Sequence, residues 1–254
     1  MNESVKMQSL EVSATRQASW QRAIAESEAW PPERVLLWAE REYGEGVAIA
    51  SAFGVEGIAL IDLAAQVWTK PVFVLDTGFL FPETYQLIEQ VEERYDISVK
   101  SVLPVLTPDT QAERFGNALW KQDPDLCCHL RKVEPLRGKL AGLQAWVTSI
   151  RREQTVERGS IRKIEWDERF HLVKINPLAD WSLEQVWRYV HSRKLPYNPL
   201  HDRAYPSLGC IHCTRAVTPG EDPRAGRWPG FSKRECGLHS SEAPRETAIP
   251  QALK

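Results

Sequence analysis

Residues 47–67 have the sequence VAIASAFGVEGIALIDLAAQV, in which a short apolar run leads through a turn into apolar residues at helical spacing. The first four residues fit a buried strand, and residues 55–67 fit a helix. The order recurs, because an apolar run at 72–75 is followed by helical spacing over 82–95, with proline at the first helical position. A third apolar run lies at 145–150. This alternation predicts an α/β fold, a parallel sheet sandwiched by helices.

Ligands of such a sheet bind beyond the carboxyl ends of its strands. We therefore expect the site at residues 51–57, 76–81 and 150–155. The first of these turns offers backbone N–H groups and a helix dipole to an anion, although it lacks the Gly-Lys-Ser/Thr ending of a Walker A loop. Asp76 and Thr77 are placed to meet a ribose or a base. Plain helix capping is the alternative for both turns.

Composition narrows the class of protein. The chain has 254 residues, of which 43% are hydrophobic and 26% charged, as in an ordinary globular protein of one or two domains. The net charge of -2 gives no general basic field for a nucleic-acid partner. No apolar stretch approaches the roughly 20 residues that cross a bilayer, and residues 1–17 lack the apolar core of a secretory signal. We expect a cytoplasmic protein with no membrane partner.

Positive charge is concentrated locally. Between residues 127 and 163 there are nine Lys or Arg against three Glu. Such a run is usually a solvated face, but this one flanks a cysteine pair and a predicted strand end. Arg224 and Arg227 lie close together later in the chain, and guanidinium pairs suit phosphate or sulfate. A local anion site is therefore plausible, and a solvated surface is the alternative.

Four of the five cysteines form two pairs, Cys127-Cys128 and Cys210-Ile-His-Cys213. Four thiolates complete one [4Fe-4S] cluster or one tetrahedral zinc site. Zinc sites normally use two cysteines separated by two to four residues on both sides, and an adjacent pair departs from that spacing. The pattern favours one [4Fe-4S] cluster per chain. Zinc and unrelated core cysteines are the alternatives.

The fifth cysteine, Cys236, lies in the segment Lys-Arg-Glu-Cys-Gly-Leu-His at 233–239. Two cations and a histidine nearby favour the thiolate, which is the nucleophilic form of cysteine. A nucleophile is therefore one interpretation. The other is an exposed thiol on a frayed tail.

Together these motifs resemble the sulfonucleotide reductases of assimilatory sulfate reduction, and most closely the bacterial iron–sulfur branch that acts on adenosine 5′-phosphosulfate (APS). The resemblance implies a fold of the adenine nucleotide α-hydrolase type, in its PP-loop ATP-pyrophosphatase branch. It is carried by residues 51–57, 75–84, 127–136, 150–154, 210–213, 220–228 and 235–239.

The resemblance also implies a chemistry. Cys236 would attack the sulfur of APS, release AMP and carry an S-sulfocysteine, from which thioredoxin would free sulfite. Such a reaction chiefly needs positioning and charge stabilisation. The cluster would then have a structural and electrostatic role, with Lys132 linking it to the substrate sulfate. Its ligands would be Cys127, Cys128, Cys210 and Cys213.

The same resemblance implies the substrate contacts, in which Arg224, Arg227 and His239 would clamp the phosphosulfate. Two departures from the family pattern concern the nucleotide turns: Gly57 stands where aspartate is common, and Phe79 and Phe81 replace more polar residues. The resemblance also implies a homo-oligomer. The expected substrate-binding residues are Ser51, Phe53, Gly54, Glu56, Leu75, Asp76, Thr77, Gly78, Lys132, Arg151, Arg152, Arg224, Arg227 and His239.

Three rival functions remain at this stage. A reductase of the 3′-phosphorylated substrate PAPS, or one that uses both nucleotides, would keep the nucleophile, but PAPS reductases typically lack the two cysteine pairs. A PP-loop iron–sulfur enzyme of tRNA thiolation would need an intact Ser-Gly-Gly-x-Asp-Ser loop and a basic surface, and neither is visible. A zinc-binding protein without catalysis would make Cys236 dispensable.

Outside the central units, helical patterns cover 18–30 and 32–43, and Ser182 caps a further helix that runs to about residue 194. The last sixty or so residues are rich in Pro, Gly and Arg and show little periodicity, which predicts a loop-dominated, partly mobile tail. We expect three segments: N-terminal helices packing on the core (1–45), a nucleotide-binding α/β domain with the iron–sulfur site (46–217) and a tail carrying the nucleophile (218–254).

Overall fold

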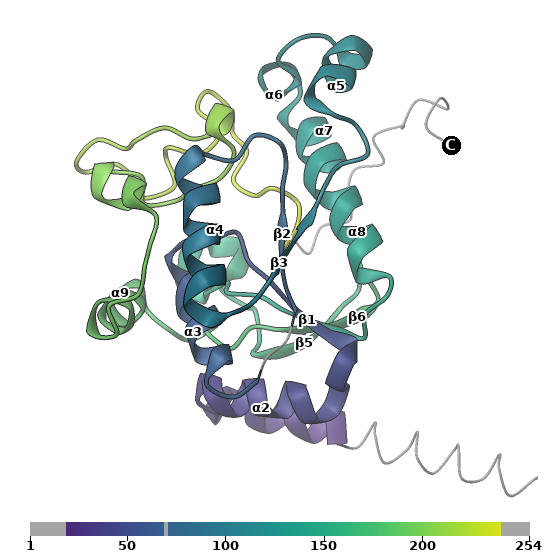
Figure 1. Ribbon diagram of the computed structural model, residues 1–254, viewed down its shortest axis with the longest axis vertical. Coiled ribbons are helices and arrows are strands. Elements are labelled where there is room, and N and C mark those ends of the chain that lie inside the picture. Colours follow the sequence, from purple (N-terminus) through teal and green to yellow (C-terminus); the bar gives the residue numbers. More distant parts are fainter. Residues whose placement is uncertain (1–18, 69–70, 240–254) are drawn as a thin grey trace, which may run out of the picture.

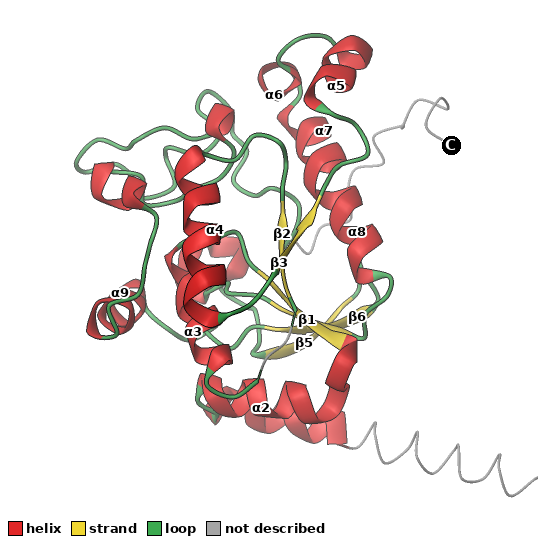
Figure 2. Ribbon diagram, in the orientation of Figure 1, coloured by secondary structure: helices red, strands yellow, loops and turns green. Residues whose placement is uncertain are grey.

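The computed structural model describes residues 19–68 and 71–239, and within these ranges it contains one six-stranded sheet flanked by helices (Figures 1 and 2). The strand order is β3-β2-β1-β4-β6-β5, and neighbours pair in parallel except β5 and β6. The predicted fold class is thus confirmed, with an antiparallel edge strand added. The strands are β1 (Val47–Ala50), β2 (Val72–Leu75), β3 (Val99–Val102), β4 (Ala145–Val147), β5 (Ile164–Asp167) and β6 (Leu172–Ile175).

Helices cover both faces of this sheet because successive strand residues point to opposite sides. In β1, Val47 and Ile49 face the core shared with α2, α3, α4 and α9, whereas Ala48 faces the smaller core under α8. Figure 1 shows α3 and α4 on one side of the sheet and α8 on the other. The helices are α2 (Pro32–Tyr43), α3 (Val55–Ala65), α4 (Pro82–Tyr95), α5 (Pro108–Phe115), α6 (Leu119–Gln122), α7 (Pro124–Cys128), α8 (Glu134–Leu140) and α9 (Leu183–Ser192).

Helix starts follow the predicted signals. Proline occupies the first turn of α2 and α4. At α9, the Ser182 hydroxyl accepts from the Gln185 N–H while the Gln185 side chain accepts from the Ser182 N–H, a capping box. Residues 19–26 are also helical, as expected. The expectations for residues 1–18 and for the tail beyond residue 239 lie outside the described residues.

Two boundaries and three strands differ from the sequence-based expectation. α3 ends at Ala65, and β4 ends at Val147, three residues before the predicted end at Ile150. After Val147 the chain leaves the sheet, and the Thr148 hydroxyl donates to the Asn176 side chain at 2.6 Å. β3, β5 and β6 were not predicted from the sequence, because charged residues stand among their apolar ones.

The proposed three-segment division stays a prediction, although α2 shares its core with the sheet through Val35, Leu36 and Ala39. No helix within the described ranges is long and apolar enough to cross a membrane.

The buried carboxylate of Asp62 ties three helices together. It accepts from the hydroxyls of Tyr95 at 2.8 Å and Tyr189 at 2.7 Å, and from Arg193 Nε at 2.6 Å. We expect Asp62→Ala to lower the free energy of unfolding by about 2 kcal/mol, because it removes the buried acceptor shared by two partly buried tyrosine hydroxyls. Glu184→Ala, in an exposed ion pair, should change it by less than about 0.5 kcal/mol in the same denaturant titration. Equal losses in both variants would contradict this role for Asp62.

Candidate active site

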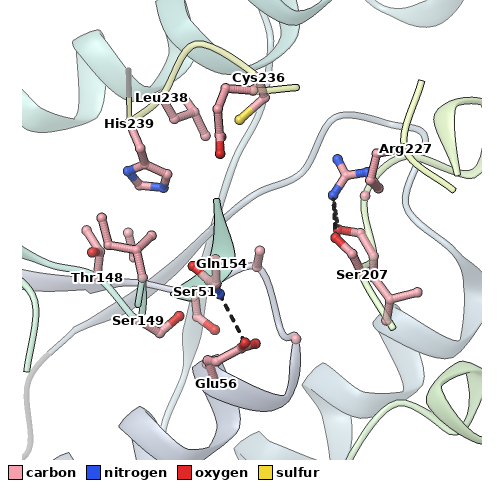
Figure 3. Close-up of a pocket in the computed structure, with 18 of the residues that line it drawn as sticks. Ser51, Glu56, Thr148, Ser149, Gln154, Ser207, Arg227, Cys236, Leu238 and His239 are labelled. Atoms are coloured by element: carbon pink, nitrogen blue, oxygen red, sulfur yellow. Dashed lines mark hydrogen bonds between the residues drawn. The ribbon is translucent and has the colours of Figure 1, made fainter. Parts of the chain in front are cut away.

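The carboxyl ends of β1, β2 and β4 open onto a cavity of about 420 Å³, a volume typical of small-molecule sites (Figure 3). Its walls include eleven of the residues predicted for catalysis or substrate binding: Ser51, Gly54, Glu56, Leu75, Thr77, Lys132, Arg151, Arg224, Arg227, Cys236 and His239. They come from segments up to 188 residues apart, since Ser51 is the first and His239 the last. The fold therefore gathers most of the predicted site in one place.

Residues 51–57 form the turn between β1 and α3. The Ser51 hydroxyl accepts from the Phe53 N–H at 3.1 Å, and Phe53 has a left-handed φ of 55°. A Cβ atom at Gly57 would lie 2.5 Å from the Ser51 hydroxyl oxygen. Glycine at position 57, noted above as a departure, therefore leaves room for the Ser51 side chain at the cavity wall.

Four predicted substrate residues lie outside the cavity walls. Phe53 is fully buried in the core, and the Asp76 carboxylate accepts from the Gly78 N–H at 2.9 Å, as in a local cap. Arg152 is ion-paired with Glu28 and turns towards the N-terminal segment. Asp76 does not cap α4, whose N-cap is Phe81, and its carboxylate instead closes its own turn and accepts from the Tyr85 hydroxyl at 2.8 Å.

The cysteine pairs lie beside this cavity. Cys127 and Cys128 end α7, which continues through a π-helical turn (His129–Val133) into α8, and Cys210 and Cys213 flank a short 3₁₀ turn. All four are buried free thiols and line one small second cavity. Phe79, Trp120 and His212 close that cavity, the Trp120 and His212 rings being stacked 4.0 Å apart. Cys210 Sγ lies 3.3 Å from the Thr77 hydroxyl, so the two cavities share a wall.

Two cations face these thiols. Arg131 is 1% exposed, donates from Nη1 to the Leu106 carbonyl at 3.0 Å, and has no partner for Nε or Nη2 among the described residues. Lys132 follows it on the π-helical turn and lines both cavities. Burial alone lowers the pKa of Lys132, but the cysteines around it hold the pKa above its ordinary value. A buried cation with unused donors calls for negative charge in the cysteine cavity.

The arrangement of the four buried cysteines indicates whether they suit a single metal ion or an iron–sulfur cluster. Burial raises the pKa of Cys127 to about 12, so a bound metal would have to displace its proton. Among the residues that the structure describes, no three His, Cys, Asp or Glu side chains converge as ligands of one metal ion do. Cysteines around a [4Fe-4S] cluster bind different irons and need not converge in that way. Donor type, burial and the neighbouring cations fit a cluster.

Cys236 lies at the cavity rim between Leu238 and the Arg227 side (Figure 3). The neighbouring cations that the sequence suggested are arranged differently in the fold, because Lys233 is ion-paired with Asp125. The His239 ring stacks on Trp146 at 5.7 Å, and burial together with nearby cations lowers its pKa well below the ordinary value. His239 is therefore a neutral hydrogen-bonding group, and the cations that interact with Cys236 include Lys132, Arg169 and Arg224.

Ser207 orients the two arginines. Its hydroxyl accepts from Arg227 Nη1 at 3.2 Å and from Arg224 Nη1 at 3.4 Å (Figure 3 shows the first). Arg227 also donates to the Leu208 carbonyl at 2.8 Å. Any side chain at Gly209 would overlap the Arg227 guanidinium. The loop that leads to Cys210 thus fixes the guanidinium pair at the cavity wall.

Sequence reasoning missed several polar residues of the cavity. Gln154 and Glu235 lie within the quoted motifs, so their motifs were a signal, whereas Ser207 lies in none of them. The residues missed include Thr148, Ser149, Gln154, Arg158, Ser207 and Glu235.

Comparison of the sequence with known proteins identifies similar proteins of one family. Residues 46–216 match the family described as phosphoadenosine phosphosulfate reductase domain. The chain is 50% identical over 207 residues to a Halalkalibacterium halodurans protein named adenosine 5′-phosphosulfate reductase, covering 81% of this chain and 90% of that protein. It is 47% identical over 213 residues to a Gloeobacter violaceus protein named phosphoadenosine 5′-phosphosulfate reductase, covering 82% and 88%.

A solved structure supports the same family. The phosphate complex of phosphoadenylyl-sulfate (PAPS) reductase from Candida auris has a TM-score of 0.69 and 30% identity to this chain, covering 79% of this chain and 97% of that chain. The fold and the sequence thus lead to one conclusion. This chain belongs to the sulfonucleotide reductase family, as its motifs predicted.

Proposed function

We propose that this protein reduces APS to sulfite and AMP in assimilatory sulfate reduction, with thioredoxin as the reductant. The observation that carries the proposal is the single cavity in which a nucleotide-binding turn, an arginine pair and Cys236 meet. The choice of APS as substrate is supported by the 50% sequence identity to a protein named adenosine 5′-phosphosulfate reductase. All five cysteines are free thiols, which suits a cytoplasmic protein.

In the proposed reaction, the turn at 51–57 and Leu75 hold the AMP part, while Arg224 and Arg227 neutralise the phosphosulfate. The Cys236 thiolate attacks the sulfuryl sulfur, so a sulfur–sulfur bond forms and the sulfur–oxygen bond to AMP breaks. Charge moves onto the departing phosphate oxygen, where fixed cations stabilise it. Neutral His239 donates a hydrogen bond to a sulfate oxygen.

Sulfite release completes the cycle. One thioredoxin thiolate attacks Cys236 Sγ and expels sulfite, and the second thioredoxin thiol then resolves the mixed disulfide. The two electrons come from the thioredoxin dithiol, and Cys236 returns as a thiolate. Because the thiosulfonate must reach a protein partner, the segment that carries Cys236 has to leave the cavity during the cycle.

We further propose that Cys127, Cys128, Cys210 and Cys213 hold a [4Fe-4S] cluster. When bound, the cluster supplies fixed negative charge and rigidity beside the substrate cavity. Support comes from four buried thiols around one small cavity and from the unused donors of Arg131. Lys132, which lines both cavities, would carry positive charge towards the sulfate.

PAPS is the alternative substrate, since one relative at 47% identity is named a PAPS reductase. The deciding assay compares thioredoxin-dependent sulfite release from APS and from PAPS, at matched concentrations, with protein purified without oxygen. A large preference for APS is expected. A preference for PAPS would overturn the proposed substrate, and no sulfite from either nucleotide with the cluster intact would overturn the reductase function.

The arginine pair gives a prediction about substrate capture. We expect Arg227→Ala to lower kcat/KM for APS by about 30-fold or more, because losing one partner of a buried charge pair costs about 2 kcal/mol or more. Arg224→Ala should act in the same direction. Arg215→Ala is the control, since Arg215 pairs with Glu221 outside the cavity walls. Steady-state kinetics of sulfite release will decide, and unchanged kcat/KM in both cavity variants would exclude the proposed clamp.

A further inference from the structure

The residue before Cys236 is held by a buried ion pair. Arg158 Nη2 lies 2.7 Å from Glu235 Oε2, and both side chains are only 8% exposed. The Thr155 hydroxyl donates to the other oxygen of Glu235 at 3.2 Å. Arg224 Nη2 lies 3.7 Å from that same oxygen, Oε1, so Glu235 has a second, more distant cationic partner. Breaking the close pair is costly chiefly for Arg158, because its buried guanidinium would keep an uncompensated charge.

Hydrogen bonds connect this ion pair to the turn at residues 51–57. Arg158 Nη1 donates to Gln154 Oε1 at 2.5 Å, and Gln154 Nε2 donates to Glu56 Oε1 at 3.0 Å, as Figure 3 shows for the second contact. Glu56 lies in the first turn of α3, and Arg151 Nη2 donates to it at 2.9 Å. All five side chains line the substrate cavity. A continuous polar chain thus runs along the cavity from the nucleotide turn to the neighbour of Cys236.

The segment that carries Cys236 is not positioned by regular secondary structure. Within the described chain, residues 229–239 contain no helix or strand. Cys236 is fixed from both sides by side-chain contacts instead. Glu235 is bound by Arg158, and the carbonyl of Gly237, which has a φ of +81°, accepts from Arg169. Without Arg158, Glu235 keeps only Thr155 and the more distant Arg224 as partners, so Cys236 loses its shortest ionic anchor on the side that faces the cavity.

We propose that Arg158 and Glu235 form a latch that positions Cys236 over the substrate, and that Gln154 and Glu56 link this latch to nucleotide binding. The proposal rests on the proposed role of Cys236 as the nucleophile. Arg158 and Glu235 are positioning residues, because they act through the backbone next to Cys236.

The test uses the full-length, cluster-loaded protein with Arg158→Gln, Glu235→Gln and the double variant. We expect each single variant to lower kcat for sulfite release about 10- to 100-fold, since small misplacements of a reacting group have effects of this size. KM for APS should change less than about threefold. The double variant should be no slower than the slower single variant, because both remove the same contact.

A second readout does not need turnover. Iodoacetamide labelling of Cys236, followed by peptide mass spectrometry, should be several-fold faster in either single variant. Arg188→Gln, from an exposed ion pair on α9, is the matched control and should label like the parent. If Arg158→Gln does not fold, the nearly isosteric Glu235→Gln variant carries the test.

Unchanged labelling in the latch variants, strictly additive losses in kcat, or losses confined to KM would each overturn the latch. Failure of the proposed function has a different signature. In that case the parent protein releases no sulfite from APS, while the labelling comparison still tests whether Arg158 and Glu235 hold Cys236.

Discussion

A Cys236→Ser variant is expected to release sulfite from APS at least about 1,000-fold more slowly than the parent protein, the scale on which single nucleophile removals act. A serine hydroxyl stays protonated near neutral pH, and the nearby His239 is a weak base because its pKa lies well below the ordinary value. The chemical step should therefore fail while the cavity keeps its shape. Thioredoxin-dependent sulfite release measures the loss.

Two controls separate chemistry from binding. Because serine is close to cysteine in size, AMP should bind to Cys236→Ser as it does to the parent in calorimetry. Incubation with APS and no reductant should add one sulfonate to the peptide containing Cys236 in the parent and none in the variant. Undiminished sulfite release by Cys236→Ser would exclude Cys236 as the nucleophile.

The second large effect is expected at the cysteine cavity. Cys213→Ser should lose nearly all iron and acid-labile sulfide, because a hydroxyl replaces one of four soft thiolate ligands. Iron and sulfide analysis with visible absorption measures this. Cys236→Ser is the matched control, since it changes a cysteine outside the proposed ligand set and should keep both elements.

The metal content also decides the nature of the group. Purified parent protein that contains zinc without acid-labile sulfide would overturn the cluster. Cys213→Ser with full iron and sulfide would instead remove Cys213 from the ligand set. Both results can be distinguished from a folding defect by circular dichroism of the same samples.

Burial decided which strands could be predicted from the sequence. β1 and β2 have the bounds of their apolar runs, since a central parallel strand is buried on both faces. β3 lies at the sheet edge and exposes Lys100 and Ser101, so it lacks such a run. β6 is buried as well, but Lys174 interrupts its apolar run and pairs with Glu165 of β5 at 3.3 Å across the antiparallel ladder, a contact that local periodicity cannot reveal.

The candidate site was predictable where it follows strand ends or quoted motifs, as for Ser51, Thr77 and Cys236. Pairings between distant segments were not. Arg152 belongs to a motif, yet it is ion-paired with Glu28, 124 residues earlier in the chain. Ser207 orients both arginines through contacts between loop residues 17 and 20 positions apart, where no periodic pattern links them.

The loop at 207–213 contributes to both the substrate cavity and the cysteine cavity. Its Ser207 and Gly209 contact the arginine pair, and its Cys210 and Cys213 line the cysteine cavity. With the cluster bound as proposed, a cell short of iron would make chains whose arginine pair has lost its support. Damage by oxygen would do the same to chains already made. The supply of iron would then limit how much APS such a cell can turn into sulfite.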